Sequence, residues 1–354
     1  MSVTPVPDEP GRTRGLPALK RGRWATVRAT LTGLACVGLA TPIAFQPHAK
    51  VAGPGAGPPP YVPASGAYLG IVPNFNLNAT FEQQALAFER KMSRQLGLVA
   101  IYLNWGQVPP MRSLDPLEDK GALPLINMNC GPSDSSIAAG LHDHELVILA
   151  NALRSYGAPV LFRWFWEMNL PNANGHAACL GTTNQGATYI AAFQHIWTVF
   201  RQVGASNVSF VWCPSDSANA AHKTDLYFYP GNRYVDWIGA DIYDRPTITS
   251  TFAQQFGPFY SYWAGVAPKK PFVIAETGAV GSPAQVLWLH QIESALTVKL
   301  PGSSATPFSH IHAVSYVNAI ALANYILKDG TPGFDQFSKM AHSRYFSVYV
   351  KPEV

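Results

Sequence analysis

Short hydrophobic runs alternate with amphipathic stretches from Ala67 to the end of the chain. The runs are continuous rather than strictly alternating, which is typical of parallel strands covered on both faces. Helices are predicted from Thr80 to about Leu96, from Asp143 to Tyr156 and from Thr188 to Val203. We predict strands over residues 67–72, 98–103, 123–128, 159–165, 208–212, 235–240, 272–275 and 311–316.

Eight strand–helix units between residues 67 and 354 predict an α/β domain built as a (β/α)8 TIM barrel. A doubly wound open sheet is the alternative, and it would need a glycine-rich phosphate turn after the first strand. The sequence there is Gly70-Ile71-Val72-Pro73-Asn74, which is not such a turn. In a barrel, the polar residues at the strand C-termini meet on one face.

The first 66 residues do not follow this pattern. Residues 1–28 are basic, residues 29–46 carry no charge, and residues 47–66 are rich in proline and glycine. A basic flank before an apolar run indicates either a cleaved signal peptide or a retained membrane anchor. The following segment is predicted to be a linker. We therefore expect a secreted or extracytoplasmic domain over residues 67–354, in the second case anchored to the membrane through residues 29–46.

Composition narrows the possible functions. The chain is 47% hydrophobic and 13% charged, with a formal net charge of +4. Much of the positive excess lies in residues 1–28, so the remaining domain is nearly neutral. It offers no basic face that could neutralise phosphates, and we expect no nucleic-acid partner.

The sequence indicates neither a metal site nor a cofactor. The stretch His142-Asp143-His144-Glu145 contains metal-ligating residue types, but histidines two positions apart do not share a helix face. Among the cysteines of the exported part, we predict a disulfide between Cys130 and Cys179, which both lie in loops after neighbouring strands. Cys213 ends a predicted strand, and we expect a buried free thiol there.

Two glutamates follow predicted strands on the expected active face. Glu167 comes just after the run 159–165, and Glu276 comes directly after the run 272–275. Retaining glycoside hydrolysis needs two carboxyl groups: one donates a proton to the leaving oxygen, and the other attacks the anomeric carbon. Each glutamate alone could equally be an isolated acidic residue at a strand end.

Other residues near the predicted strand ends can serve such a reaction. Arg163 would favour the ionised form of Glu276, and Tyr243 could donate a hydrogen bond to it. The alternatives are an internal ion pair between Arg163 and Asp241, and a tyrosine that only packs. The candidate substrate-binding residues are Trp105, Arg163, Trp166, Asn169, Asp241 and Tyr243.

The aromatic and amide candidates also have structural alternatives. Trp105 and Trp166 can stack on sugar faces or fill the core, and Asn169 can hold a hydroxyl or cap a loop. The rings of Trp164, Phe165 and Trp166 are expected to shield the Glu167 carboxyl from water, which would raise its pKa and keep it protonated.

Four stretches of the chain resemble glycoside hydrolase family 26, whose best-known members are endo-β-1,4-mannanases. They are residues 159–169, 207–214, 229–243 and 270–278. The most specific is 229–243, which contains Tyr-Pro-Gly and Val-Asp-Trp-Ile-Gly. The resemblance runs roughly from Ala67 to the C-terminus. It implies a (β/α)8 barrel with retaining chemistry, the acid/base at Glu167 and the nucleophile at Glu276.

The resemblance implies a secreted or membrane-anchored O-glycosyl hydrolase. It would cleave internal β-linkages of a mannan-like polysaccharide, with xylan and mixed-linkage glucan as further candidates, and we expect a monomer. The alternative is a non-catalytic glycan-binding protein of the cell envelope on a decayed barrel.

The chain departs from the family pattern beside the reacting sugar. Trp166 stands where the family has histidine, and Leu170 stands where glycine is frequent. The last strand, residues 313–318, lacks an expected tryptophan. These departures predict a preferred substrate other than unsubstituted β-1,4-mannan.

Overall fold

The computed structural model describes residues 61–110, 114, 119, 121–170, 186–215, 225–244 and 250–350. The predicted N-terminal segments, residues 1–28 and 29–46, and most of the linker 47–66 lie outside these ranges. None of the helices in the described ranges has the length and apolar character needed to span a membrane.

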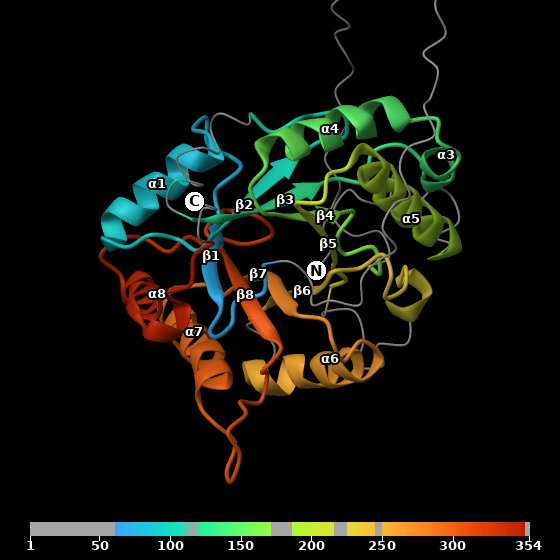
Figure 1. Ribbon diagram of the computed structural model, residues 1–354. Helices are drawn as coiled ribbons and strands as arrows, with labels where there is room; N and C mark the ends of the chain where they lie inside the picture. Colours follow the sequence, from blue (N-terminus) through green and yellow to red (C-terminus); the bar gives the residue numbers. More distant parts are fainter. Residues whose placement is uncertain are drawn as a thin grey trace, which may run out of the picture. The chain divides into compact units, whose positions relative to one another are not determined.

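Within the described part of the chain, eight parallel strands close into a barrel in sequence order (Figure 1). This confirms the predicted (β/α)8 architecture. Pairing between the first and last strands closes it, with Tyr68 opposite Ala313 and Val72 opposite Val317. The strands are β1 (Tyr68–Val72), β2 (Leu98–Leu103), β3 (Leu123–Met128), β4 (Val160–Trp164), β5 (Val208–Trp212), β6 (Trp237–Tyr243), β7 (Phe272–Gly278) and β8 (Ile311–Val317).

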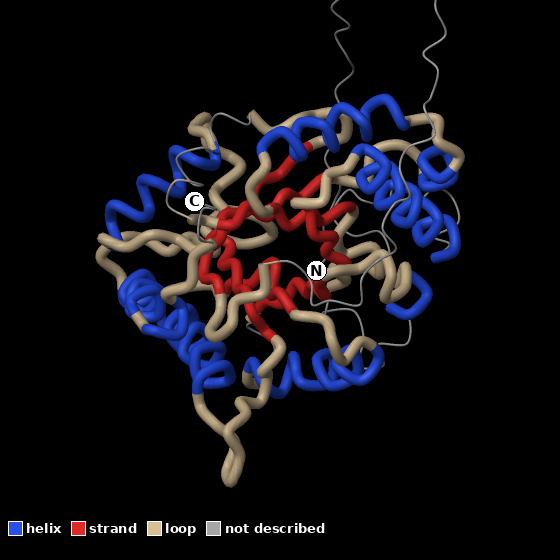
Figure 2. Tube along the Cα trace, viewed as in Figure 1, coloured by secondary structure: helices blue, strands red, loops and turns tan. Residues whose placement is uncertain are grey.

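Helices surround the ring of strands (Figure 2). Thr80 caps the first of them through a capping box with Gln83, which satisfies backbone N–H groups that otherwise lack partners. The α-helices are α1 (Phe81–Met92), α3 (Asp134–Ala138), α4 (Asp143–Tyr156), α5 (Gly186–Val203), α6 (Phe252–Val266), α7 (Ser282–Thr297) and α8 (Pro332–His342). The short 3-10 helices are η4 (Asp225–Phe228) and η5 (Arg344–Phe346).

The strands are buried along nearly their whole length, which explains their continuous apolar sequences. Large rings such as Trp212, Trp237 and Trp288 fill the layer between strands and helices. Polar side chains are buried as well, and three of them, Asn127, Arg163 and Asp241, belong to β3, β4 and β6. Buried polar groups need hydrogen-bond partners. These three side chains partner one another beneath the active face, where Arg163 donates to both Asn127 and Asp241.

Cys130 is disulfide-bonded, and Cys213 is a buried free thiol. Cys179 lies outside the described residues, so its pairing with Cys130 stays a prediction.

One buried carboxyl is placed unfavourably for its charged form. Asp134, at the start of α3, is 3% exposed, and neither of its side-chain oxygens has a hydrogen-bond partner. Burial raises its pKa from 3.8 to about 7. Tyr189, on the neighbouring α5, likewise has a buried hydroxyl without a partner. The folded protein should therefore be more stable when the Asp134 carboxyl is protonated than when it is ionised.

We predict that Asp134→Asn changes the pH dependence of stability. The wild-type carboxyl stays protonated in the folded state up to about pH 7 but ionises near pH 3.8 when unfolded. Its folded state therefore loses stability as pH rises through this window. Asp134→Asn cannot ionise, so its free energy of unfolding should exceed that of the wild type by a larger amount at pH 8 than at pH 4. Denaturant titrations measure it, with the exposed Asp329→Asn as control. An equal difference at both pH values would contradict the assignment.

Candidate active site

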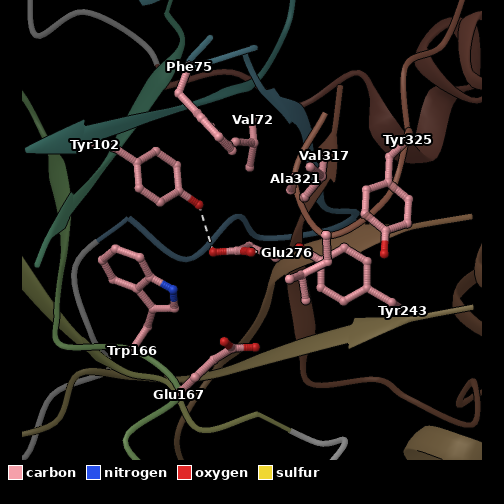
Figure 3. Close-up of a pocket in the computed structure, with 11 residues that line it drawn as sticks. Val72, Phe75, Tyr102, Trp166, Glu167, Tyr243, Glu276, Val317, Ala321 and Tyr325 are labelled. Atoms are coloured by element: carbon pink, nitrogen blue, oxygen red, sulfur yellow. Dashed lines mark hydrogen bonds between the residues drawn. The ribbon is translucent and has the colours of Figure 1, made fainter. Parts of the chain in front are cut away.

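A pocket with a cavity volume of about 310 Å³ opens at the C-terminal end of the barrel (Figure 3). Its walls come from β1, β2, β6, β7 and β8 and from the loops that follow β1, β4 and β8. Both predicted catalytic glutamates face this one cavity. The lining residues are Val72, Phe75, Tyr102, Trp166, Glu167, Tyr243, Glu276, Val317, Ala321, Leu322 and Tyr325.

Glu276 receives hydrogen bonds on both carboxylate oxygens. Tyr102 donates its hydroxyl to Oε1 at 2.6 Å, and Tyr243 donates to Oε2 at 2.6 Å. Arg163 adds an ion pair to Oε1 at 2.5 Å. Burial by itself raises the pKa of Glu276, but the guanidinium charge and these hydrogen bonds outweigh it and lower that pKa. Glu276 is thus held as an oriented carboxylate.

Arg163 is completely buried and serves two carboxylates at once. It binds both oxygens of Asp241, at 2.7 and 2.9 Å, and reaches Glu276 with its other terminal nitrogen. Its Nε donates to Asn127 at 2.5 Å. Burial disfavours the charged form, but the neighbouring carboxylates raise the pKa of Arg163 and keep it protonated. The two roles considered for Arg163, internal ion pair and partner of Glu276, therefore coexist.

The backbone after β4 is strained where it presents Glu167. Phe165 and Glu167 adopt positive φ angles of 45° and 56°, which non-glycine residues rarely take. The Glu167 amide donates to the carbonyl of Cys213 at 2.8 Å, which anchors this turn to the neighbouring strand. The turn brings Trp166 and Glu167 to the pocket.

The three rings around Glu167 do not act together as expected. Trp164 and Phe165 both pack against Tyr189 on α5, at centroid distances of 5.2 and 5.6 Å. Of the three, Trp166 alone lines the pocket. It is held by the Arg163 guanidinium 4.9 Å from its ring centre and by Tyr102 edge-on at 5.2 Å.

Besides the buried Arg163, three other candidate substrate-binding residues lie outside the pocket lining. The Trp105 indole covers Gly131, where an added Cβ would lie 2.3 Å from the ring. Asn169 exchanges two 2.8 Å hydrogen bonds with the backbone of Ser215, so it fastens two loops together. Asp241 lies beneath the floor as the partner of Arg163.

Tyr102 is the main site residue absent from the sequence-based set. The register places Tyr102 beside Asn127 and Asn127 beside Arg163 on adjacent strands. The position of Tyr102 near the end of its predicted strand could have identified it, because residues in register on neighbouring strands can point into the same part of the barrel interior. Among the described residues, no group of three His, Cys, Asp or Glu side chains could hold a metal ion.

Sequence comparisons support the resemblance seen in the motifs. The sequence model of Glycosyl hydrolase family 26 matches residues 140–292. Endoglucanase H of Acetivibrio thermocellus is 29% identical over 225 residues, which cover 60% of this chain and 23% of that protein. Mannan endo-1,4-beta-mannosidase of Bacillus subtilis is 33% identical over 138 residues, 37% of this chain and 33% of the relative. The chain thus spans a third or less of the length of these relatives.

Solved structures share the fold at low sequence identity. The endo-beta-1,4-mannanase double mutant of Cellulomonas fimi superposes with a TM-score of 0.59 at 17% identity, covering 79% of this chain and 71% of that one. A GH26 beta-mannanase from Bacteroides ovatus gives a TM-score of 0.57 at 14% identity, covering 81% and 91%. These similarities establish the barrel architecture.

We predict that Tyr102→Phe raises the pKa of Glu276, because the carboxylate loses a hydrogen bond that favours its charged form. The carboxylate would then take up a proton at higher pH than in wild type. NMR titration of carbon-labelled glutamate can follow this, with the exposed Tyr227→Phe as a matched control. An unchanged Glu276 titration would show that the phenol does not tune it.

Proposed function

We propose that this chain, which belongs to glycosyl hydrolase family 26, is a retaining endo-glycosidase that cleaves internal β-linkages of a polysaccharide. The observation that carries the proposal is the pair of glutamates in one pocket at the C-terminal end of the barrel. The environment of Glu276 lowers its pKa, as a nucleophile requires. Family membership supports the same reaction class.

In the proposed first step, Glu276 attacks the anomeric carbon while Glu167 gives its proton to the leaving glycosidic oxygen. An ester bond forms between Glu276 and the sugar, and the bond to the leaving oxygen breaks. In the second step, Glu167 takes a proton from water, the water attacks the anomeric carbon, and the ester breaks. Arg163, Tyr102 and Tyr243 orient the carboxylate before attack.

The substrate is expected to be a β-linked polysaccharide of the mannan, xylan or mixed-linkage glucan type. The names of three relatives span this range: an endoglucanase, a beta-1,3-xylanase and a mannan endo-1,4-beta-mannosidase. The environment of Trp166 favours a substrate other than unsubstituted mannan. Its ring is fixed between Arg163 and Tyr102 and lines the pocket where the family pattern has histidine.

We also propose that the enzyme acts outside the cytoplasm as a monomer. The basic residues 1–28 followed by the uncharged run 29–46 support export, with either cleavage or membrane anchoring. N-terminal sequencing of the native protein would distinguish the two.

The catalytic assignment predicts opposite stereochemistry when azide rescues the two alanine variants. Both variants should lose most turnover on polysaccharide, at least about a hundredfold for the acid/base. In Glu276→Ala, azide replaces the nucleophile and should give an α-glycosyl azide from an activated β-glycoside. In Glu167→Ala, azide attacks the glycosyl-enzyme and should give a β-glycosyl azide.

Product NMR measures the anomeric configuration, and circular dichroism verifies that the variants fold. Wild-type rates in either variant would refute its role. Tight glycan binding by a wild-type protein that cleaves nothing would favour the non-catalytic alternative.

We predict that Trp166→His shifts specificity toward mannan. An imidazole can both donate and accept hydrogen bonds, whereas an indole offers one donor and more bulk. One regained hydrogen bond is worth roughly 0.5–1.5 kcal/mol, so kcat/KM on mannan relative to xylan should rise up to about tenfold. The exposed Leu287→His serves as control. An unchanged ratio would mean that Trp166 does not select the sugar.

A further inference from the structure

We propose that the pocket selects a sugar unit that carries an acyl ester, with O-acetyl as the simplest case; this rests on the proposed glycosidase function. The acyl group would lie on an apolar wall beside Glu276. We define the apolar wall as Val72, Phe75, Val317, Ala321 and Leu322, all of which line the pocket.

The pocket has two chemically different sides (Figure 3). Glu167 and the Trp166 indole lie on one side of Glu276, and Val72, Phe75, Val317 and Ala321 lie on the other. The wall side chains contain no polar atom. Tyr102 and Tyr243 donate their hydroxyl hydrogens to Glu276, so these hydrogens are not directed toward a ligand group that lies on the wall.

The proposed chemistry places the glycone near this wall. The leaving group departs past Glu167, which protonates its oxygen. The ring that keeps the anomeric carbon stays bonded to Glu276, in the part of the pocket that the wall encloses. A free hydroxyl turned toward Val72 and Val317, which are 1% and 2% exposed, would lose its water partners and find no replacement, which weakens binding by roughly tenfold or more. Esterification removes that hydroxyl and adds a methyl group.

The apolar surface continues outward beyond the reach of one sugar ring. Phe75 and Leu322 are 46% and 79% exposed, and Leu77 and Ile320 beside them are 55% and 48% exposed. The two loops that carry these residues are joined, because the Asn76 side chain donates to the Ile320 carbonyl at 2.7 Å. A bridge between Ile320 and Asn324 closes the second loop. Exposed apolar surface next to a pocket is typical of a ligand-binding site.

The composition of the two loops favours a neutral, partly polar ligand. Residues 73–79 read Pro-Asn-Phe-Asn-Leu-Asn-Ala, and residues 318–324 read Asn-Ala-Ile-Ala-Leu-Ala-Asn. Neither loop carries a charge, so nothing there attracts an anionic lipid surface. Asparagine amides can bind ester carbonyls and sugar hydroxyls, and the apolar residues between them can contact acyl methyl groups.

An unsubstituted pentose explains the wall less completely. Losing the hydroxymethyl group would relieve crowding, but the remaining ring hydroxyls would still face hydrocarbon. A bare pentose would also leave Phe75 and Leu322 uncovered. The acyl ester accounts for both the wall and its exposed extension.

The test compares acetylated polysaccharides with the same preparations after mild alkaline deacetylation. Acetylated glucomannan and acetylated xylan are the probes. We expect kcat/KM to be about tenfold higher on the acetylated member of at least one pair. Higher or equal kcat/KM on both deacetylated members, including a preference for unsubstituted xylan, would overturn the proposal.

Leu322→Asn should reduce the ratio of acetylated to deacetylated kcat/KM, because it places a polar group on the wall. The matched control is Leu287→Asn, an equally simple change at a leucine on α7 that is 59% exposed. It should leave the ratio unchanged. An equal ratio in wild type and Leu322→Asn would refute the assignment of the wall.

Affinity electrophoresis through gels containing each probe separates this proposal from the glycosidase proposal. Selective retardation by the acetylated probe without any turnover would support the wall and contradict the glycosidase. Turnover without any preference for acetylated substrate would do the reverse.

Discussion

The buried guanidinium of Arg163 is the interaction on which the rest of the site depends. A fully buried charge is tolerated only when it is paired and hydrogen-bonded, and Arg163 is paired with two carboxylates from neighbouring strands. Asp241 holds it from below, and Glu276 meets it from the pocket. Without this cation, two buried carboxylates on adjacent strands would repel one another. The same group thus stabilises the barrel interior and keeps the proposed nucleophile ionised.

The barrel provides the precision that this network requires. Tyr102, Asn127 and Arg163 lie in register on three adjacent strands, and Asp241 pairs with Glu276 on two others. Rigid strands therefore fix the donors around Glu276. Glu167 is positioned differently, by a turn with two positive φ angles that is anchored to Cys213. Strain of this kind persists only where the surroundings hold it, and it is frequent at functional sites.

Much of the framework could be predicted from the sequence because continuous apolar runs mark buried parallel strands. The positions of Glu167 and Glu276 after predicted strands also indicated that both belong to the site, because the C-terminal ends of all strands lie on one face of a barrel. Partner choice was less predictable. Arg163 has two carboxylate partners instead of one. Trp164 alternates with the inward-facing Arg163 on β4 and therefore packs against α5, and Phe165 packs there where the positive-φ turn begins.

Side chains whose role depends on distant segments were the hardest to predict. The hydroxyl of Tyr102 meets Glu276 across 174 positions of sequence, and only the barrel register brings them together. The apolar wall joins loops after β1 and β8, which are adjacent because the barrel closes. Trp105 and Asn169 have the residue types of sugar ligands, yet their contacts with Gly131 and Ser215 are decided by loop packing.

We expect Glu276, held by Arg163, to form a covalent bond with the sugar. Trapping with a 2-deoxy-2-fluoro glycosyl fluoride of the preferred sugar, followed by peptide mass spectrometry, tests it directly. We predict one added sugar, attached to the peptide containing Glu276 and absent from Glu276→Ala. An adduct on Glu167, or turnover of polysaccharide by an enzyme that accumulates no adduct, would contradict it.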